Sequence, residues 1–410
     1  MLSLLIFTLL QVQPMQMLRE DPDRAGVNTH AYEFRDIPGT PSPKGYRPVY
    51  ISHYGRHGSR TDWGLSNYTY VVNILEKADS AGILTPEGDS LLQEARTVAE
   101  VHHGANGHLT RLGEKEHRMI AERMYRNYPE VFRKGNKVVR VESSTVHRCL
   151  VSMASFTGEL ARLQPDLQIE MDSDDVIMGY ISNGASDEHL RISEGMLKPL
   201  KEVPTDTVRV LTKLFRDPVA GRCIVGDVNR LQDKIWCVAR VARSSGISSD
   251  VYRHLPYDVI YKWWDYSNRE LYIRHGNSVE FGKERMKRAE PLVNDIVTKA
   301  DEALSTGRYA ADLKFGHDYP LMALAGFLHL SEVGDTMSFD EIPVKWSDPM
   351  NIPFASNLQM IFYRNRKSPE VLVKFVYNDV ERTIPQLSPI SGVYYRWDDV
   401  KEMIASEKSE

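Results

Sequence analysis

Cysteine is scarce in this sequence: only Cys149, Cys223 and Cys237 occur among 410 residues. Three cysteines allow at most one internal disulfide, so a disulfide-stapled framework is excluded, while a bridge between Cys223 and Cys237 stays open. No cysteine stands at the C-x-x-C or Cys/His spacings that are typical of zinc sites. We therefore expect neither a metal centre nor a bound cofactor.

An excess of positive charge is also lacking, since the formal net charge is −5 and the pI is about 6.3. Nucleic-acid-binding proteins favour a basic surface, so nucleic acid is not an expected partner. An anionic substrate would have to be drawn by a local basic pocket. Hydrophobic residues make up 42% and charged residues 26%, as in ordinary globular proteins. At about 150 residues per domain, the length predicts two or three domains.

Long hydrophobic runs are confined to the beginning of the chain, where residues 2–10 are apolar apart from two hydroxyl residues. This run is too short to span a bilayer, and no other stretch could cross one. It resembles the apolar core of a secretory signal peptide, although the first basic residue is Arg19. We expect residues 1–14 to be a signal segment and the protein to be periplasmic or secreted; the alternative is a buried N-terminal strand or helix.

Strands and helices alternate along the chain after an irregular, proline-rich arm at 19–48. Apolar runs predict strands at 46–52, 137–144, 167–174 and 311–316, and helical spacing predicts helices at 67–82, 85–103, 109–132, 145–163, 290–305 and 318–330. Thr85 and Thr110 are the expected N-caps of two of these helices. A β-hairpin within 358–385 extends the predicted sheet. The pattern is that of an α/β sheet with crossover helices.

Between about 175 and 285 the sequence becomes helix-rich and aromatic. We interpret this stretch as an inserted, mainly helical cap domain, and residues 19–174 and 286–410 as the α/β domain. Internal repeats and low-complexity tracts are absent from the sequence.

Two strand-to-helix junctions carry the chemistry: Arg56-His57-Gly58-Ser59-Arg60 and Gly316-His317-Asp318. In open α/β sheets the ligand site lies outside the carboxyl ends of the strands. Both junctions would lie there, as would Arg148 near the start of the helix after "VVRVESS". Three separated segments would thus supply three arginines, two histidines and one carboxyl group to a single crevice.

Such a set matches a phosphoryl group. Guanidinium groups bind its oxygens in bidentate fashion and offset charge in the transition state. Cationic neighbours keep an imidazole neutral, so that it can act as a nucleophile. A carboxylic acid such as Asp318 could protonate the departing alkoxide.

These residues resemble the motifs of the histidine phosphatases, in the acid phosphatase and phytase branch. "RHGSR" is similar to the R-H-G-x-R motif, "GHDYPLMALAGFL" to the H-D motif, "GHLTRLGEKEHRMIAERMYRNY" to the L-T-x-x-G segment, and "SSTVHRCLVSMASF" to the segment of the third arginine. The last is most similar to multiple inositol polyphosphate phosphatases. Those enzymes usually have H-A-E where this chain has H-D, the form of bacterial phytases and glucose-1-phosphatases.

The resemblance implies a phosphoglycerate-mutase-like three-layer α/β domain with an inserted helical domain over the site. It implies that His57 is the nucleophile and forms a phosphohistidine, and that Asp318 is the proton donor. It further implies that the phosphate is bound by Arg56, Arg60, Arg148 and His317. The expected partner is a small phosphate ester, with inositol phosphates expected among the substrates.

Other interpretations of the same residues remain open. A broad sugar-phosphate phosphatase is favoured by the H-D form, while a mutase and a non-catalytic phosphate-binding protein are weaker alternatives. "RHGNS" at 274–278 repeats R-H-G but has serine where the second arginine should be, so we assign it no role. "HHGANGH" at 102–108 is poorly spaced for a metal site. His53 and His147 are expected to be packed or supporting residues.

Overall fold

One mixed sheet organises the fold, with the strand order β3-β2-β4-β1-β5-β6-β7 and with β8 paired to β6. The computed structural model describes residues 16–133, 138–182 and 184–408. The strands are β1 (Tyr46–Arg56), β2 (Val138–Ser143), β3 (Gln168–Asp172), β4 (Tyr309–Gly316), β5 (Asn357–Asn365), β6 (Val371–Tyr377), β7 (Val380–Arg382) and β8 (Tyr395–Arg396).

The sheet is parallel on one side and antiparallel on the other. Strands β1, β2, β3 and β4 pair in parallel, whereas β5 pairs antiparallel to β1 and to β6. The predicted hairpin at the end of the chain is therefore confirmed as β5 and β6. Strand β4 is buried along its whole length, as expected for a central strand covered on both faces.

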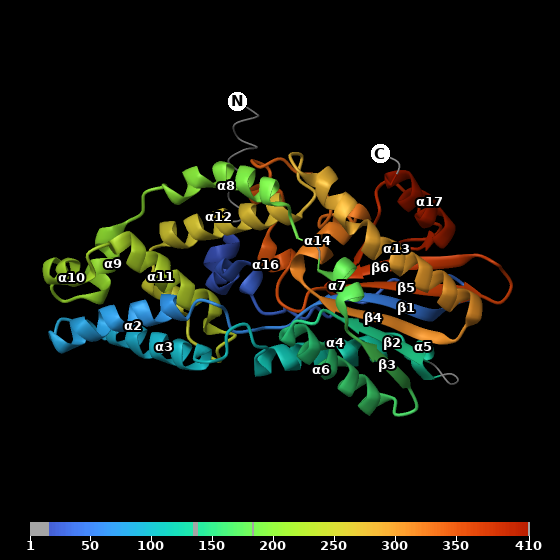
Figure 1. Cartoon of the computed structure of the whole chain (residues 1–410), viewed down its shortest axis with the longest axis horizontal. Helices are drawn as coiled ribbons and strands as arrows, with labels where there is room; N and C mark the ends of the chain where they lie inside the picture. The colour runs from blue at the N-terminus through green and yellow to red at the C-terminus, as the bar shows by residue number, and fades with distance from the viewer. Residues whose placement is uncertain (1–15, 134–137, 183, 409–410) are drawn as a thin grey trace.

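Helices cover both faces of the sheet (Figure 1). One face packs against α4 (Arg111–Asn127), α5 (Pro129–Arg133) and α6 (His147–Leu163). The other face packs against α7 (Asp175–Ile181), α13 (Gly282–Thr306), α14 (Asp318–Phe327) and α17 (Trp397–Glu407). Two separate apolar cores, one on each face, confirm the predicted three-layer α/β architecture.

Several helix starts follow from local chemistry. Thr85 and Thr110 cap their helices as predicted, because their side-chain oxygens accept from the amides of Gly88 and Gly113. Each satisfies one of the amide groups that the first turn of a helix leaves unpaired. Pro86 stands at the first position of its helix, where a missing N–H costs nothing.

A second lobe is built of helices and lies beside the sheet (Figure 1). It contains α2 (Leu65–Ser80), α3 (Pro86–His102), α8 (Asp187–Lys201), α9 (Thr207–Leu214), α10 (Pro218–Val225), α11 (Val228–Ala242), the 3₁₀ helix η2 (Val251–His254) and α12 (Tyr257–His275). The predicted insert at 175–285 is mainly helical in its described part. One apolar core joins α2 and α3 to α9–α12.

This packing differs from the predicted division in two places. Helices α2 and α3, which the sequence assigned to the α/β domain, share the core of the helical lobe. Helix α7, at the start of the predicted insert, packs with the sheet through Ile177 and Ile181. Hydrophobic spacing reveals an apolar helix face but not what covers it, so the domain limits at 175 and 285 stay a prediction.

The irregular arm contains the 3₁₀ helix η1 (Pro22–Thr29), which contacts α11, α12 and α16 (Asp348–Asn351). In Figure 1 it is dark blue, between the two lobes. Val27, inside this turn, has φ 61° and ψ −134°. Positive φ is a strained conformation for a β-branched residue.

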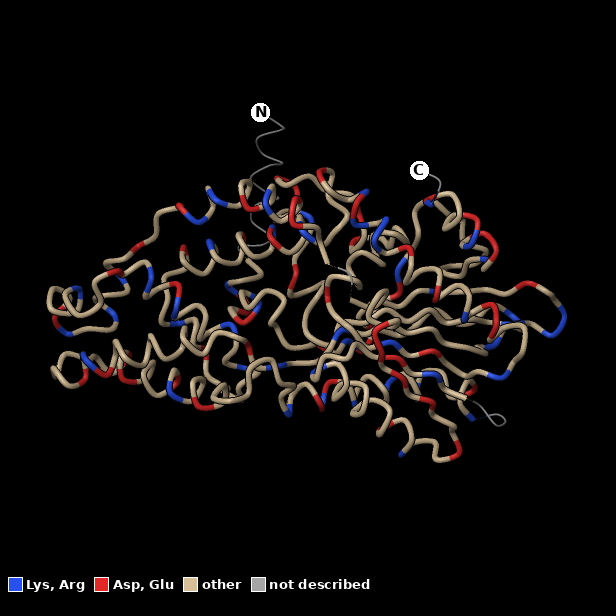
Figure 2. Tube along the Cα trace, in the orientation of Figure 1, with Lys and Arg blue, Asp and Glu red and all other residues tan. Residues whose placement is uncertain are grey.

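Three remaining expectations concern the termini, the cysteines and the charges. The predicted signal segment at 1–14 lies outside the described residues. Among the described helices, none has the length and apolarity needed to cross a membrane. All three cysteines are free. Basic and acidic residues are interspersed along the described trace of both lobes (Figure 2).

Candidate active site

The carboxyl ends of neighbouring parallel strands carry the predicted site residues. Arg56 is the last residue of β1, and the amide of the next residue, His57, donates to the Gly316 carbonyl over 2.9 Å. Gly316 ends β4, and α14 begins two residues later at Asp318. Arg148 lies in the first turn of α6, which follows β2. The order β2-β4-β1 therefore gathers three segments that are far apart in the sequence.

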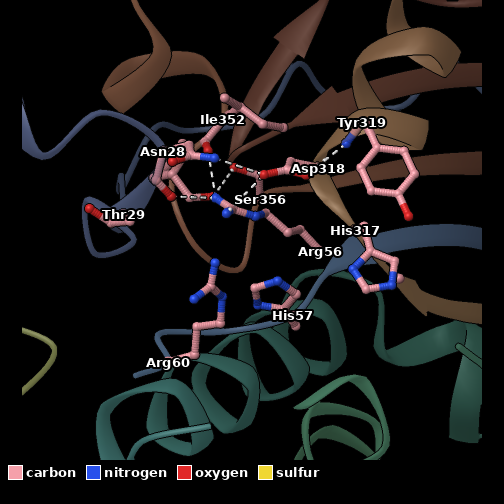
Figure 3. Close-up of polar contacts among 12 residues, drawn as sticks. Asn28, Thr29, Arg56, His57, Arg60, His317, Asp318, Tyr319, Ile352 and Ser356 are labelled. Carbon is pink, nitrogen blue, oxygen red and sulfur yellow. Dashed lines mark hydrogen bonds and ion pairs between the residues drawn. The ribbon is translucent and has the colours of Figure 1, made fainter. Parts of the chain in front are cut away.

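The side chains converge on the His57 ring (Figure 3). This ring lies below the Arg56 side chain, with Arg60 on one side and His317 on the other. The centroids of the two imidazole rings are 5.8 Å apart and the rings are nearly perpendicular. Arg148 Nη2 lies 3.4 Å from His317 Nδ1, so the third arginine reaches the same place.

The turn after β1 is packed tightly against the start of α4. A Cβ atom at Gly58 would come within 2.6 Å of the Gly113 carbonyl oxygen, so this position requires glycine. The Thr110 hydroxyl donates to the Ser59 carbonyl over 3.0 Å. The buried Glu116 carboxylate accepts from the Ser59 amide and hydroxyl, each over 2.7 Å. The L-T-x-x-G segment and the helix that follows it therefore hold the R-H-G-x-R turn in place by packing and hydrogen bonds.

The three arginines each retain an unused donor. Arg56 Nη1 donates to the carbonyl oxygens of Asn28 and Ile352 over 2.6 and 2.9 Å. Among the described residues, however, the Nε atoms of Arg56, Arg60 and Arg148 are buried and have no hydrogen-bond partner. A buried donor without a partner costs about 1–3 kcal/mol. The arrangement is therefore suited to a polyvalent anion that would accept these bonds.

His57 is held in a neutral form with one nitrogen available. Burial, and then the charges of Arg56, Arg60 and Arg148, lower the pKa of His57 well below its usual value. Nδ1 lies 3.0 Å from the Gly58 carbonyl oxygen. Because a carbonyl only accepts, Nδ1 carries the proton and the lone pair is on Nε2. A neutral imidazole with a free Nε2 can attack an electrophile.

Asp318 is paired with an arginine of the same site. Its Oδ2 lies 3.0 Å from Arg56 Nη2 and accepts from Asn28 Nδ2 over 2.9 Å. Burial alone would raise the pKa of Asp318, but Arg56, His275 and His317 outweigh it and hold the pKa far below its ordinary value. The carboxyl group is thus ionised in the free protein. It can act as an acid only after it has gained a proton.

His317 is oriented by its neighbours on both sides of the ring. Its Nε2 is 3.1 Å from the Ser144 hydroxyl. Its ring stacks on that of Tyr319, with centroids 5.4 Å apart and an interplanar angle of 3°. Burial, followed by Arg148, lowers the pKa of His317 to about 4. At neutral pH it is therefore a neutral hydrogen-bonding group.

Sequence reasoning missed several residues that touch this set. Asn28 in the arm, Ser144 after β2 and Ser152 in α6, whose hydroxyl accepts from the Gly58 amide over 3.1 Å, were not singled out. The "SS" of "SSTVHRC" was a signal for Ser144. Asn28 carries no local signal, because its contact with Asp318 spans 290 residues of sequence.

His53, His147 and His102 lie outside this group, whereas His275 lies beside Tyr319 and helps to lower the pKa of Asp318. His53 is buried between Phe156 and Phe315, as expected for a packed residue. His147 is exposed and lies against His108, so it is not packed in the core. His102, from the "HHGANGH" stretch, is buried and bonds the carbonyl of its own helix.

One group of potential metal ligands occurs among the described residues, away from the predicted site. Asp21, His30 and Glu33 lie within 4.8 Å of one another. Arg24 is 3.8 Å from Asp21 and 3.5 Å from Glu33. The guanidinium thus pairs with both carboxylates, so these residues form an ion-pair cluster.

Comparison with known proteins gives a family match over most of the chain. The family model described as histidine phosphatase superfamily (branch 2) matches residues 55–378. This range includes every residue predicted for the site. No curated protein sequence matches the chain.

Solved structures share the fold. A multiple inositol polyphosphate phosphatase of Bifidobacterium longum, in complex with phosphate, superposes with a TM-score of 0.75 at 16% identity, covering 94% of this chain and 98% of that one. The phytase from D. castellii gives a TM-score of 0.65 at 15% identity, covering 94% and 85%. The phytase from Citrobacter braakii gives 0.55 at 13% identity, covering 88% and 98%.

Proposed function

The chain belongs to branch 2 of the histidine phosphatase superfamily and is a histidine acid phosphatase; from this premise we propose how it acts and on what. We propose that it is a phosphomonoesterase that works without a metal ion, through a phosphohistidine at His57. The observation that carries the proposal is the group of three buried arginine Nε donors, all unpartnered in the described chain, around a neutral imidazole.

The arginines bind the phosphoryl group of the substrate. Arg56, Arg60 and Arg148 supply N–H donors to its oxygens and stabilise the charge that develops on them in the transition state. His317 adds a neutral imidazole beside Arg148, oriented by the Ser144 hydroxyl. Together these groups supply the positive charge that metal ions supply in other phosphoryl-transfer sites.

The transfer proceeds in two steps at His57. Nε2 attacks phosphorus, a nitrogen–phosphorus bond forms and the bond to the leaving oxygen breaks, while Asp318 gives that oxygen a proton. Water then attacks the phosphohistidine and gives its proton to Asp318. The nitrogen–phosphorus bond breaks, inorganic phosphate leaves and the starting state is restored.

The ion pair between Arg56 and Asp318 links binding to proton transfer. A bound phosphate competes for Arg56 and brings negative charge near the carboxylate. Both effects raise the pKa of Asp318 from its low value in the free protein. Asp318 is therefore protonated when substrate is bound. This favours activity at acidic to neutral pH.

Inositol phosphates are the proposed substrates. The named structural neighbours include an inositol polyphosphate phosphatase and phytases, and the "SSTVHRC" segment is of the first type. The His317-Asp318 form of the acid supports the alternative, a broad sugar-phosphate phosphatase. Export to the periplasm or the medium is part of the proposal and rests on the N-terminal sequence.

Phosphate release in the presence of EDTA tests this function. Purified wild type and His57→Ala would be given inositol hexakisphosphate and glucose 1-phosphate at mildly acidic and neutral pH. Release by wild type alone, faster from the inositol ester, is the expected result. Preference for the sugar ester would move the assignment to the broad phosphatase. Phosphate binding without turnover of either ester would support a binding protein instead.

A further inference from the structure

The N-terminal arm places a neutral amide on the proposed proton donor. Asn28 Nδ2 donates to Asp318 Oδ2 over 2.9 Å, and the backbone carbonyl of Asn28 accepts from Arg56 Nη1 over 2.6 Å. One residue of the arm thus touches both members of the Arg56–Asp318 ion pair, as Figure 3 shows. The two-step transfer at His57 gives this residue no part.

We propose that Asn28 is a positioning residue that orients the Asp318 carboxyl group for proton delivery. The inference rests on the proposed function, in which Asp318 protonates the leaving oxygen. It assigns a role to a residue that lies outside the part of the chain matched by the family model.

The hydrogen bonds around the carboxyl group make the assignment. Oδ2 accepts from Asn28 Nδ2 and faces Arg56 Nη2. Oδ1 accepts from the Tyr319 amide over 2.9 Å. With two donors on Oδ2 and one on Oδ1, the free lone pair is on Oδ1, and a proton is best placed there. When phosphate draws Arg56 away, one donor remains on each oxygen, Asn28 Nδ2 on Oδ2 and the Tyr319 amide on Oδ1, and these two bonds fix the orientation of the carboxyl group.

The arm is held in a way that fixes this amide. Thr29 donates through its hydroxyl to the Arg240 carbonyl of α11 over 2.9 Å, and the His30 carbonyl accepts from the Phe354 amide over 2.9 Å. The residue on the other side, Val27, is buried and has φ 61°. Strained backbone persists only where the surrounding structure fixes it, and such strain gathers at functional sites.

The carboxyl group of Asp318 has several charged or titratable neighbours, so an effect of Asn28 must be separated from theirs. They come from β1, α6, α12, α14 and β6 and are Arg56, Arg148, Cys149, His275, His317, Tyr319, Tyr54 and Tyr377. None of these neighbouring residues is changed in an Asn28 variant. Removing a donor from the ionised carboxylate destabilises its charged form, which raises its pKa.

The test compares two phosphate esters across pH. Asn28→Ala removes the amide but leaves the backbone carbonyl on Arg56. For glycerol 2-phosphate, whose alkoxide needs a proton, we expect kcat/KM to fall about 10-fold, as for loss of one hydrogen bond to a charged group. For 4-nitrophenyl phosphate, whose phenolate departs without a proton, we expect little change. The alkaline limb of the glycerol 2-phosphate profile should move to higher pH.

Two further variants keep the test decisive. Thr40→Val removes a remote anchor of the arm, the hydrogen bond that the Thr40 hydroxyl donates to Glu381 over 2.6 Å, and leaves Asn28 in place, so the difference between the two esters and the pH limb should stay as in wild type. Asn28→Asp has the same shape but puts a like charge beside Asp318, so its pH limb should move further than that of Asn28→Ala. This variant also covers the case in which Asn28→Ala fails to fold.

The outcomes separate the inference from the proposed function. Equal losses on both esters with an unshifted pH limb, or no loss at all, would overturn the role of Asn28 while His57→Ala remains inactive. If wild type hydrolyses neither ester, the proposed function fails and the inference fails with it.

Discussion

The letters R-H-G occur twice in this chain, at Arg56-His57-Gly58 and at Arg274-His275-Gly276, and the structure gives them opposite surroundings. The first stretch ends a buried parallel strand, and Arg56 keeps a buried Nε without a partner among the described residues. The second ends α12, where all three nitrogens of Arg274 are engaged by carboxylates or a hydroxyl of α8 and α12.

The two stretches share their residue types and differ in unused hydrogen-bonding capacity. At the end of α12 the guanidinium is neutralised within its own lobe by Glu270 and Glu194. At the end of β1, Arg56 pairs with Asp318 and Arg60 with Asp62, and the Nε atoms of Arg56, Arg60 and Arg148 still have no partner among the described residues. A guanidinium that already pairs with carboxylates of the protein contributes little to binding an anionic substrate.

The largest contrast should come from the two histidines. His57→Ala removes the proposed nucleophile and should lower phosphate release at least about 10⁴-fold. His275→Ala removes a ring that lies 5.5 Å from Tyr319, a contact worth about 0.5–1.5 kcal/mol, and one of the groups that lower the pKa of Asp318, but it removes no proposed nucleophile, so its loss should stay within about 10-fold. Steady-state kinetics on one ester measures both. Equal losses would erase the distinction between the two stretches.

Removal of the acid should cause the next largest loss of activity, and the size of that loss should depend on the leaving group. Asp318→Asn should lower kcat/KM for alkyl phosphates about 10²- to 10⁴-fold, the usual contribution of general acid catalysis. The loss on 4-nitrophenyl phosphate should be much smaller. A uniform loss would mean that Asp318 holds Arg56 in place instead of delivering a proton.

The two arginines give a matched pair of substitutions. Arg148→Ala should cost about 10²–10³ in kcat/KM, as for loss of a transition-state donor. Arg274→Ala breaks half-exposed ion pairs worth about 0–1 kcal/mol each and should change kcat/KM less than about 3-fold. Comparable effects of both substitutions would contradict the assignment of the phosphate-binding set.

The glycine of the first stretch should matter for stability. Gly58→Ala drives a Cβ to 2.6 Å from a backbone oxygen of Gly113 and should lower the free energy of unfolding by about 1–3 kcal/mol. Gly158, inside α6, has open space around its Cβ position. Gly158→Ala should raise the free energy of unfolding by up to about 1 kcal/mol. Denaturant titration compares the two, and tolerance of Gly58→Ala would refute the tight packing.

The last contrast should be in the slope of stability against pH. Burial, with lesser effects of His117 and Lys314, lowers the pKa of His53 to about 3 in the folded protein. Below the unfolded-state pKa near 6.5 the unfolded chain binds a proton that the folded chain does not, so stability falls as pH falls, by up to about 1.4 kcal/mol per pH unit. His53→Leu should flatten this slope between pH 6 and pH 4, whereas His147→Leu, on the exposed surface, serves as the control.

Local signals predicted most of the fold. The hydrophobic runs at β1, β2 and β4 and the capped helices α3 and α4 are where their sequences place them, because each depends on residues close in the chain. The α/β class with crossover helices followed from the alternation of these elements, whereas the strand order came from the structure alone. The helices that pack against α2 and α3 could not be predicted in this way, because the core that covers α2 and α3 is supplied by residues beyond 200.

The same distinction applies to the site. His57, Asp318 and their arginines stand in compact motifs at strand ends, where the chemistry of the residue types is visible. Asn28 stands in an arm without hydrophobic periodicity, and its contact with Asp318 crosses almost the whole chain. Positions of this kind are set by tertiary packing and become apparent only in three dimensions.

Trapping the phosphoenzyme tests the central claim most directly. Enzyme would be mixed with excess phosphate ester, quenched at alkaline pH within milliseconds and digested for peptide mass spectrometry. The account predicts a base-stable, acid-labile phosphoryl group on His57 that disappears in His57→Ala. A phosphoryl group on another residue, or steady turnover by His57→Ala, would contradict it.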